Sequence, residues 1–244
     1  MRKLILFLFI ISIFNSCEEE EFGINYEKIK LENFIIENYS NDAKQLYYEE
    51  ILSNENHFNY NNPILDTVEV NNILKIIQAV YNSNSSYRNE VFNDYSIHTR
   101  YCNSLNSIIL KVQTSSSEIV NLVNGIIPTG NTELDNILQT YEFDSLSTSY
   151  GYPNFPWLTI YTSKEYNMIP IAEELNNIPS IVLAEMNNGC IGDGNNISLK
   201  RSGDYAIITF SIGSGDCPAG CIYHKYWEFK VVNDYAEFLR EYEN

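Results

Sequence analysis

The chain has 244 residues, and 15 lysines and arginines stand against 32 aspartates and glutamates, a formal net charge of −17 at pH 7. Nucleic-acid binding depends on clustered Lys and Arg side chains that neutralise phosphates. A chain this acidic, without a basic patch, therefore excludes a nucleic-acid partner. The acidity instead favours solubility and association with divalent cations.

The chain opens with MRKLILFLFIISIFNSC, which has the pattern of an export signal. Arg2 and Lys3 precede an unbroken apolar run from Leu4 to Phe14. A membrane-spanning helix needs roughly 20 apolar residues, so this run is too short to remain in a bilayer. We therefore expect residues 1–16 to be a cleaved signal peptide. An ordinary secreted protein cleaved near Ser16 is the alternative.

The residues Phe-Asn-Ser before Cys17 resemble the lipobox of bacterial lipoproteins, in which the cysteine is lipidated and becomes the first mature residue. The resemblance implies Cys17 as the lipid anchor, and stable attachment takes two or more acyl chains. Residues 17–25 would then form a lipidated acidic tether. Its four glutamates resemble an export tag for the outer face of the outer membrane, or serve as a solvated spacer. We expect a membrane-anchored lipoprotein, in the bacterial outer membrane and exposed at the surface.

Four cysteines remain after Cys17, and an even number in an exported protein predicts two disulfides. Their count alone leaves three possible pairings. They are Cys102, Cys190, Cys217 and Cys221.

Residues 26–100 are expected to be helical. Apolar residues recur at helical intervals over 26–53, with an interruption that indicates two helices or one broken helix. A clearer helix is expected over 66–82, with Asp66 or Thr67 as its N-cap.

Residues 101–190 alternate strand and helix patterns. The elements run strand, helix, strand, strand, helix and strand, with the second helix capped by Thr132: strands 107–113, 143–149, 157–162 and 180–186, and helices 118–123, 132–141 and 167–177. This is the order of a ferredoxin-like β-α-β-β-α-β unit, whose last strand lies antiparallel beside its first. Cys102 precedes the first strand and Cys190 follows the last, so this order predicts a Cys102–Cys190 disulfide.

Residues 191–244 read as a three-stranded antiparallel meander, with strands over 205–212, 222–232 and 235–242. The fold class is therefore α+β: N-terminal helices, a ferredoxin-like unit and a C-terminal β-meander, stapled by disulfides. Residues 26–244 are expected to form one compact domain.

The stretch GDCPAGCIYHKYWEF admits three interpretations. A metal site would use Cys217, Cys221 and His224, but zinc usually takes four ligands, and strand alternation would point 221 and 224 to opposite faces. A redox pair would need C-x-x-C before a helix, and here the spacer is longer and a strand follows. We therefore predict a Cys217–Cys221 disulfide that pins the turn between two strands.

Asp193 belongs to GDGNNI, which has the D-x-N spacing that begins calcium-binding loops. The rest of the EF-hand pattern is absent, including its glutamate. The stretch is therefore predicted to be a glycine-rich turn stabilised by Asx hydrogen bonds. Asp193 stays a metal candidate together with Cys217, Cys221 and His224, but no metal is expected.

No Ser/His/Asp set, phosphate-binding glycine loop or metal motif passes its spacing test, so an enzyme is not expected. Apart from the lipid on Cys17, no cofactor is expected. The 19 tyrosines could form a sugar-stacking surface or simply pack the core and sheets. We expect a non-catalytic binding or interaction module that takes a protein or glycan ligand.

Two resemblances carry further expectations. The lipobox with GDGN, GDCPAGC and YWEF in the C-terminal region resembles a group of uncharacterised bacterial lipoproteins, which implies the location but no activity. The stretch WLTIYTSKEYNMIPIAEELNNIPSIVLAEMN is similar to ferredoxin-like subtilase propeptides and inhibitors. That likeness implies a peptidase-inhibitor or chaperone-like domain as the alternative function. A metal or redox protein that uses Cys217, Cys221 and His224 is the third.

Overall fold

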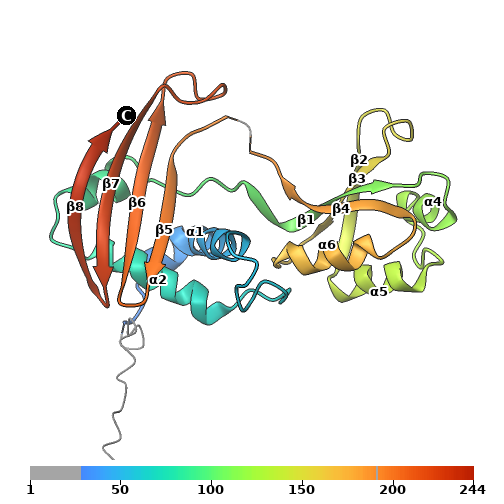
Figure 1. Ribbon diagram of the computed structural model, residues 1–244, viewed down its shortest axis with the longest axis horizontal. Coiled ribbons are helices and arrows are strands. Elements are labelled where there is room, and N and C mark those ends of the chain that lie inside the picture. Colours follow the sequence, from blue (N-terminus) through green and yellow to red (C-terminus); the bar gives the residue numbers. More distant parts are fainter. Residues whose placement is uncertain (1–28, 191) are drawn as a thin grey trace, which may run out of the picture.

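The computed structural model describes residues 29–190 and 192–244, and every structural statement below concerns these residues. Helices combine with two antiparallel four-stranded sheets, which confirms the α+β class (Figure 1). The expected signal peptide, Cys17 and the acidic tether lie outside the described residues. No helix among residues 29–190 and 192–244 has the length and apolar character needed to cross a bilayer.

Two long helices begin the described chain. Helix α1 covers Asn33–Leu52 without a break, so the expected interruption does not occur. Helix α2 covers Thr67–Tyr81, and the Asp66 side chain caps it by accepting a hydrogen bond from the Val68 amide at 2.8 Å. A short helix α3 (Tyr87–Asn89) and a π-helical turn η1 (Glu90–Asp94) follow. The helical character predicted for this region is thus present.

The C-terminal sheet has four strands, not the three that we expected, in the order β5-β6-β7-β8. Its strands are β5 (Asn196–Ser202), β6 (Tyr205–Ser214), β7 (Tyr223–Val232) and β8 (Tyr235–Glu243). The additional strand is β5, which pairs with β6 through Ile197 opposite Phe210 and Leu199 opposite Ile208. The inward apolar residues of β5 are only Ile197 and Leu199, and its other residues are polar. Its sequence therefore resembles an extension of the preceding loop.

Helices α1 and α2 cover the inner face of this sheet, and together they enclose the first hydrophobic core (Figure 1). Trp227, Phe210 and Phe229 from the sheet are fully buried there. Fully burying a large apolar side chain stabilises the fold by about 1.5–3 kcal/mol. Segments from the two ends of the described chain therefore fold as one unit.

An arginine joins the two helices to the edge of this sheet. Arg201 of β5 donates to both carboxylate oxygens of Glu50 in α1, from Nε to Oε1 at 3.2 Å and from Nη2 to Oε2 at 2.6 Å. Its Nη1 forms an ion pair with Glu69 of α2. Because the guanidinium is mostly enclosed and binds one carboxylate in two-pronged geometry, it fixes the angle between helices and sheet.

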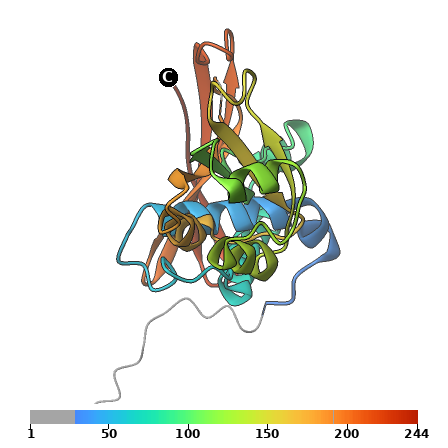
Figure 2. The same ribbon diagram turned by 90° about the vertical axis from the view of Figure 1, so that its right-hand side faces the viewer.

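The second sheet lies between the two parts of the first unit in sequence, with strand order β2-β3-β1-β4 and all pairs antiparallel. Its strands are β1 (Asn103–Val112), β2 (Phe143–Thr148), β3 (Trp157–Thr162) and β4 (Ile181–Asn188). Helices α4 (Ser117–Val123), α5 (Thr132–Thr140) and α6 (Met168–Asn176) bury their apolar side chains against it in a second core. In the perpendicular view of Figure 2 this unit lies in front of the first.

The caps of two helices in this unit are asparagines. The α5 N-cap is Asn131, whose Oδ1 accepts from the amides of Glu133 and Leu134 at 3.0 Å. The expectation that Thr132 caps this helix was therefore wrong by one residue, since Thr132 is already its first helical residue. Asn167 caps α6 by accepting from the Ile169 amide, and its Nδ2 binds the carbonyls of Tyr60 and Asn62 from the other unit.

The chain passes twice between the two units, before β1 and after β4, and these connections lie side by side (Figure 1). The amide of Gly189 donates to the carbonyl of Cys102 at 3.0 Å. Cys102 and Cys190 form a disulfide with Cα atoms 4.7 Å apart, which confirms the predicted pairing. Closing a loop of 88 residues contributes about 4.5 kcal/mol at most by the chain-entropy argument.

The second disulfide, Cys217–Cys221, lies in the connection between β6 and β7 and is also confirmed. Its Cα atoms are 3.9 Å apart. A Cβ atom at Gly213 would overlap the sulfur of Cys221, and one at Gly192 would overlap the carbonyl of Cys217. Glycine is therefore required at both positions for the disulfide loop to lie against its neighbouring loop.

Candidate functional site

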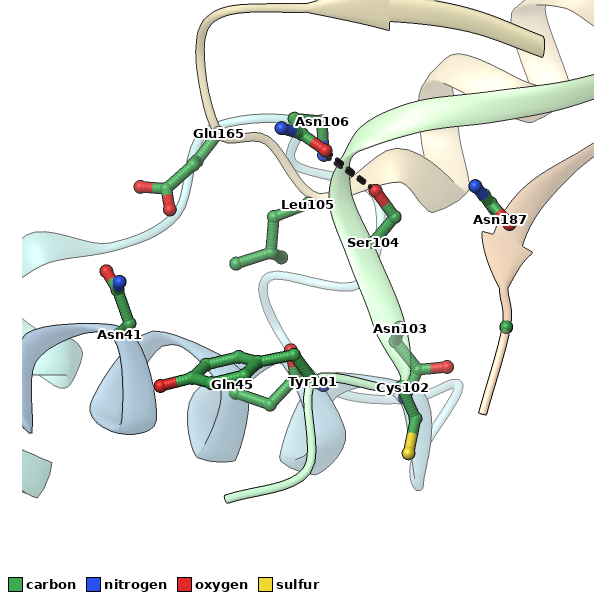
Figure 3. Close-up of a pocket in the computed structure, with 11 residues that line it drawn as sticks. Asn41, Gln45, Tyr101, Cys102, Asn103, Ser104, Leu105, Asn106, Glu165 and Asn187 are labelled. Carbon is green, nitrogen blue, oxygen red and sulfur yellow. Dashed lines mark hydrogen bonds between the residues drawn. The ribbon is translucent and has the colours of Figure 1, made fainter. Parts of the chain in front are cut away.

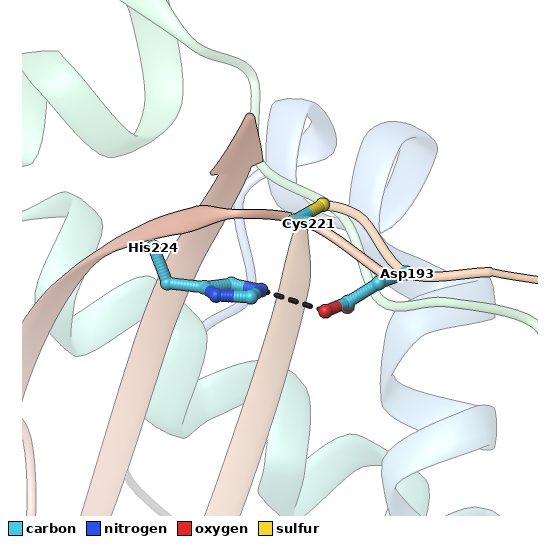
Figure 4. Close-up of side chains that lie close together, drawn as sticks. All are labelled: Asp193, Cys221 and His224. Carbon is cyan, nitrogen blue, oxygen red and sulfur yellow. Dashed lines mark ion pairs between the residues drawn. The ribbon is translucent and has the colours of Figure 1, made fainter. Parts of the chain in front are cut away.

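Three of the four metal candidates lie close together at the base of the β6–β7 loop. Ligand atoms of Asp193, Cys221 and His224 lie within 4.8 Å of one another (Figure 4). The expectation that His224 points away from Cys221 was wrong. Strand β7 begins only at Tyr223, so Cys221 belongs to the loop and strand alternation does not relate the two side chains.

The contacts of this cluster hold neighbouring loops together. His224 Nε2 lies 2.8 Å from Asp193 Oδ2, and Arg100 Nη1 lies 3.6 Å from Asp193 Oδ1. The Gly194 amide, and then His224 and Arg100, lower the pKa of Asp193. The sulfur of Cys221 is bonded to Cys217, so it is not a thiolate that could bind zinc. With the disulfide closed, only Asp193 and His224 of the cluster remain as ligands, fewer than a zinc site takes.

The asparagines of GDGNNI also bind backbone groups. Asn195 Oδ1 accepts from the Gly213 amide at 3.2 Å, and Asn196 Oδ1 accepts from the Arg100 amide at 3.0 Å. These bonds hold the loop against β6 and against the connection that leads to β1. The polar residues at this place therefore hold backbone of segments distant in sequence, whereas the predicted Asx turn would bond backbone about two residues on.

A cavity of about 370 Å³ lies at the junction of the two units (Figure 3). Helix α1 forms one wall, the start of β1 with residues 101–102 forms the floor, and Glu165 after β3 and the end of β4 complete it. Its lining consists mainly of amide and hydroxyl side chains: Asn41, Gln45, Tyr101, Cys102, Asn103, Ser104, Leu105, Asn106, Glu165, Asn187 and Gly189. This volume lies in the range of small-molecule sites, about 300–1,000 Å³.

A chain of hydrogen bonds fixes the floor of this junction cavity. Asn187 Nδ2 donates to Ser107 Oγ at 3.1 Å, and Ser107 Oγ donates to Ser104 Oγ at 2.7 Å. Ser104 Oγ in turn donates to Asn106 Oδ1 at 2.9 Å (Figure 3). The network joins β1 to β4 and orients the polar side chains before any ligand arrives.

Gln45 lines the junction cavity from α1 but is only 1 % exposed. Its Nε2 is fully buried, so a ligand in the cavity does not reach it. A hydrogen bond from the Gln45 side chain lowers the pKa of Glu49, although burial has the larger effect and raises it. Gln45 therefore packs the wall of the cavity, and the more exposed polar side chains of the lining are the ones that face a ligand.

Tyr101 supplies the aromatic surface of the junction cavity. It is 57 % exposed, and its ring lies beside Gln45 and the α1 wall (Figure 3). Partial burial and the carboxylate of Asp42 raise the pKa of Tyr101, which keeps the phenol neutral at physiological pH.

Glu165 and Tyr101 are the ionisable side chains that the described residues contribute to the cavity lining. The carboxylate of Glu165 forms an ion pair with Lys44 of α1. The two side chains stand between the junction cavity and an apolar groove of about 440 Å³ along α1 and α2. The charge of the carboxylate is therefore compensated, and the junction cavity is close to neutral.

A buried carboxylate beside the junction was not recognisable in the sequence. Asp42 of α1 is fully buried and accepts hydrogen bonds from the Thr99 amide at 2.6 Å and the Thr99 hydroxyl at 3.0 Å. His98 Nδ1 lies 2.9 Å from its other oxygen, and the His98 ring stacks on Tyr39. A histidine oriented by a carboxylate is half of a catalytic triad. Yet the hydrogen bonds found in residues 29–190 and 192–244 include none from a Ser, Thr or Cys to His98 Nε2, so the pair anchors α1.

A scan against protein-family models, a search of curated proteins and a search of solved structures each found no match to this chain.

The Asp42–His98 pair predicts a defined pH dependence of stability. The hydrogen bond from His98 to Asp42 raises the pKa of His98 above its ordinary value. The pair's contribution is therefore fully present below pH about 6.5, the pKa of an unfolded histidine, and is lost as the pH rises through the folded-state pKa. Urea unfolding of the wild type and of His98→Gln at a series of pH values measures this contribution. The difference in unfolding free energy should shrink as the pH rises; a constant or growing difference would contradict the assignment.

Proposed function

We propose that the chain is a membrane-anchored lipoprotein, facing the surface or the periplasm, whose folded part is a non-catalytic binding module. The lipobox-like residues before Cys17 support the anchor, and both disulfides fit an oxidising compartment. An outer-membrane location follows the resemblance to bacterial lipoproteins. The ligand is held at the junction cavity.

One observation carries the binding function: the junction cavity between the two units, lined mainly by amide and hydroxyl side chains, whose carboxylate Glu165 is paired with Lys44. Binding sites occur preferentially between structural units, where a few polar groups converge. The fixed hydrogen-bond network around Ser104 and Ser107 preorganises the site, which reduces the entropy lost on binding. The lining offers amides and hydroxyls without an activated nucleophile, which favours recognition over catalysis.

The anchor predicts a specific modification. After expression with its leader in a Gram-negative host, mass spectrometry of the N-terminal peptide should find acyl chains on Cys17 as the first residue. Cys17→Ser should move the protein from the membrane fraction to the soluble fraction, because the acyl chains provide the attachment. Ser16→Ala is the neighbouring control and should leave the protein in the membrane. An unacylated mature terminus would refute the anchor.

The binding site predicts where small molecules act. We would add a fragment set of uncharged polyols, amides, carboxylates and amines to the labelled protein and follow backbone amide shifts by NMR. Shifts should cluster at residues 41–45 and 101–106, and mass spectrometry should recover the fragments unchanged.

A matched pair of variants locates this binding on α1. Asn41→Trp places a ring at the junction cavity and should abolish the shifts. Asn38→Trp makes the same change at an exposed α1 position outside the described cavities, and it should leave them intact. Shifts confined to another surface, or equal loss in both variants, would contradict a ligand site at the junction.

A peptidase-inhibitor or chaperone-like domain is the second candidate. The strand order β2-β3-β1-β4, with helices between β1 and β2 and between β3 and β4, supports a ferredoxin-like unit of the subtilase-propeptide kind. Fold alone does not establish inhibition. After β4 the chain continues into Cys190 and β5, where such inhibitors have a free tail. This candidate predicts inhibition of subtilisin at micromolar concentrations, measured with a chromogenic peptide; no inhibition at that concentration would eliminate it.

A further inference from the structure

We propose that the junction cavity binds a neutral saccharide, with Tyr101 as the stacking surface and the amide side chains of Asn41 and Asn103 as hydrogen-bonding groups. The inference rests on the binding function proposed above and names the ligand class of that site. It follows from the charge, the hydrogen-bonding groups and the aromatic surface of the lining.

The charge of the lining argues against ionic ligands. Among residues 29–190 and 192–244, no Lys or Arg side chain lines the junction cavity, and anions such as phosphates and carboxylates are typically bound by Arg or Lys. The single carboxylate, Glu165, is already paired with Lys44, so it does not provide a free partner for a cationic ligand. The net charge of −17 adds a general repulsion of anions. An uncharged ligand therefore has the smallest electrostatic cost on entering the cavity.

The hydrogen-bonding groups suit hydroxyls. Each hydroxyl group both donates and accepts, and an amide side chain offers an N–H donor and a carbonyl acceptor side by side. Asn41, Asn103 and Asn187 present such groups around the junction cavity. These three residues are exposed or partly exposed, so a ligand hydroxyl can reach them. A ligand rich in hydroxyls therefore matches the lining better than an apolar one.

The aromatic surface suits the carbon–hydrogen face of a sugar ring. Tyr101 exposes more than half of its surface and borders the junction cavity, while its neighbours are fixed. The Arg100 amide is bound to Asn196, and Cys102 is cross-linked to Cys190. A rigid aromatic side chain provides contact area with little loss of conformational entropy. Its neutral phenol adds a hydroxyl that can bind the ligand.

The experiment uses the disulfide-bonded protein and three classes of probe: neutral oligosaccharides, uronic-acid or sulfated oligosaccharides, and short uncharged peptides. A glycan array would find candidate saccharides, and isothermal titration calorimetry would then measure the affinity for each class. We expect binding to neutral oligosaccharides and none to the acidic ones.

Two variants separate a ligand role from a structural one. Tyr101→Ala should weaken saccharide binding roughly tenfold, whereas Tyr150→Ala, at a fully exposed tyrosine of the β2–β3 loop, should leave it unchanged.

The outcomes distinguish this inference from the binding function on which it rests. Neutral-saccharide binding that depends on Tyr101, and not on Tyr150, supports it. Binding of peptides or acidic saccharides at the junction, abolished by Asn41→Trp, overturns the ligand class and leaves the binding module intact. Saccharide binding that is equally lost in Tyr150→Ala, or unaffected by Tyr101→Ala, overturns the site. The absence of any ligand from all three classes, together with no fragment shifts, overturns both.

Discussion

The architecture depends on one topological constraint: the chain must cross between two hydrophobic cores twice, and the two crossings must stay together. Helices α1 and α2 share their core with the C-terminal sheet, so the intervening β1–β4 unit leaves and rejoins this core through neighbouring connections. The Cys102–Cys190 disulfide fastens the crossings where they meet. Without that link, only the pairing of β1 with β4 and a few side-chain contacts would keep the crossings together.

Polar side chains at the junction convert this covalent restraint into a fixed geometry. Asp42 holds α1 against Thr99 and His98, which lie shortly before Cys102 in the connection to β1. Asn167 binds backbone carbonyls of the α1–α2 connection, and Lys44 pairs with Glu165. Burying a carboxylate such as Asp42 is unfavourable unless donors surround it. Here the donors, His98 and Thr99, belong to the connection that leads to β1. The buried charge thus specifies one arrangement of the helix and the connection.

Local patterns predicted much of the fold. The Asp66 cap and apolar stripe predicted α2, and the order of elements from residue 107 to 186 predicted that the last strand pairs with the first. That pairing in turn identified Cys190 as the partner of Cys102, which cysteine count alone left open. Strand β5 was missed because its outward residues are polar and its inward ones are only Ile197 and Leu199. Local periodicity carries the signal for an amphipathic element and is weak for a short edge strand.

The candidate site was not predictable in the same way. Asp42 and His98 are separated by 56 residues, and the junction cavity draws on α1, the segment before β1, Glu165 and the end of β4. No spacing rule connects side chains that meet only through tertiary packing. The metal candidates failed in another way: strand alternation predicted opposite faces for Cys221 and His224, the structure places them close together, and the disulfide removes the sulfur as a ligand.

The junction cavity connects stability with function. The contacts that hold the two units together also fix the walls of the cavity: the Cys102–Cys190 disulfide joins the two crossings beside it, and the Asp42 network holds α1 against the connection to β1. Hydrogen bonds among Ser104, Ser107 and Asn106 fix the floor in the unliganded protein. A lining that is fixed before binding loses little conformational entropy when a ligand enters, which is the arrangement expected of a preorganised recognition site.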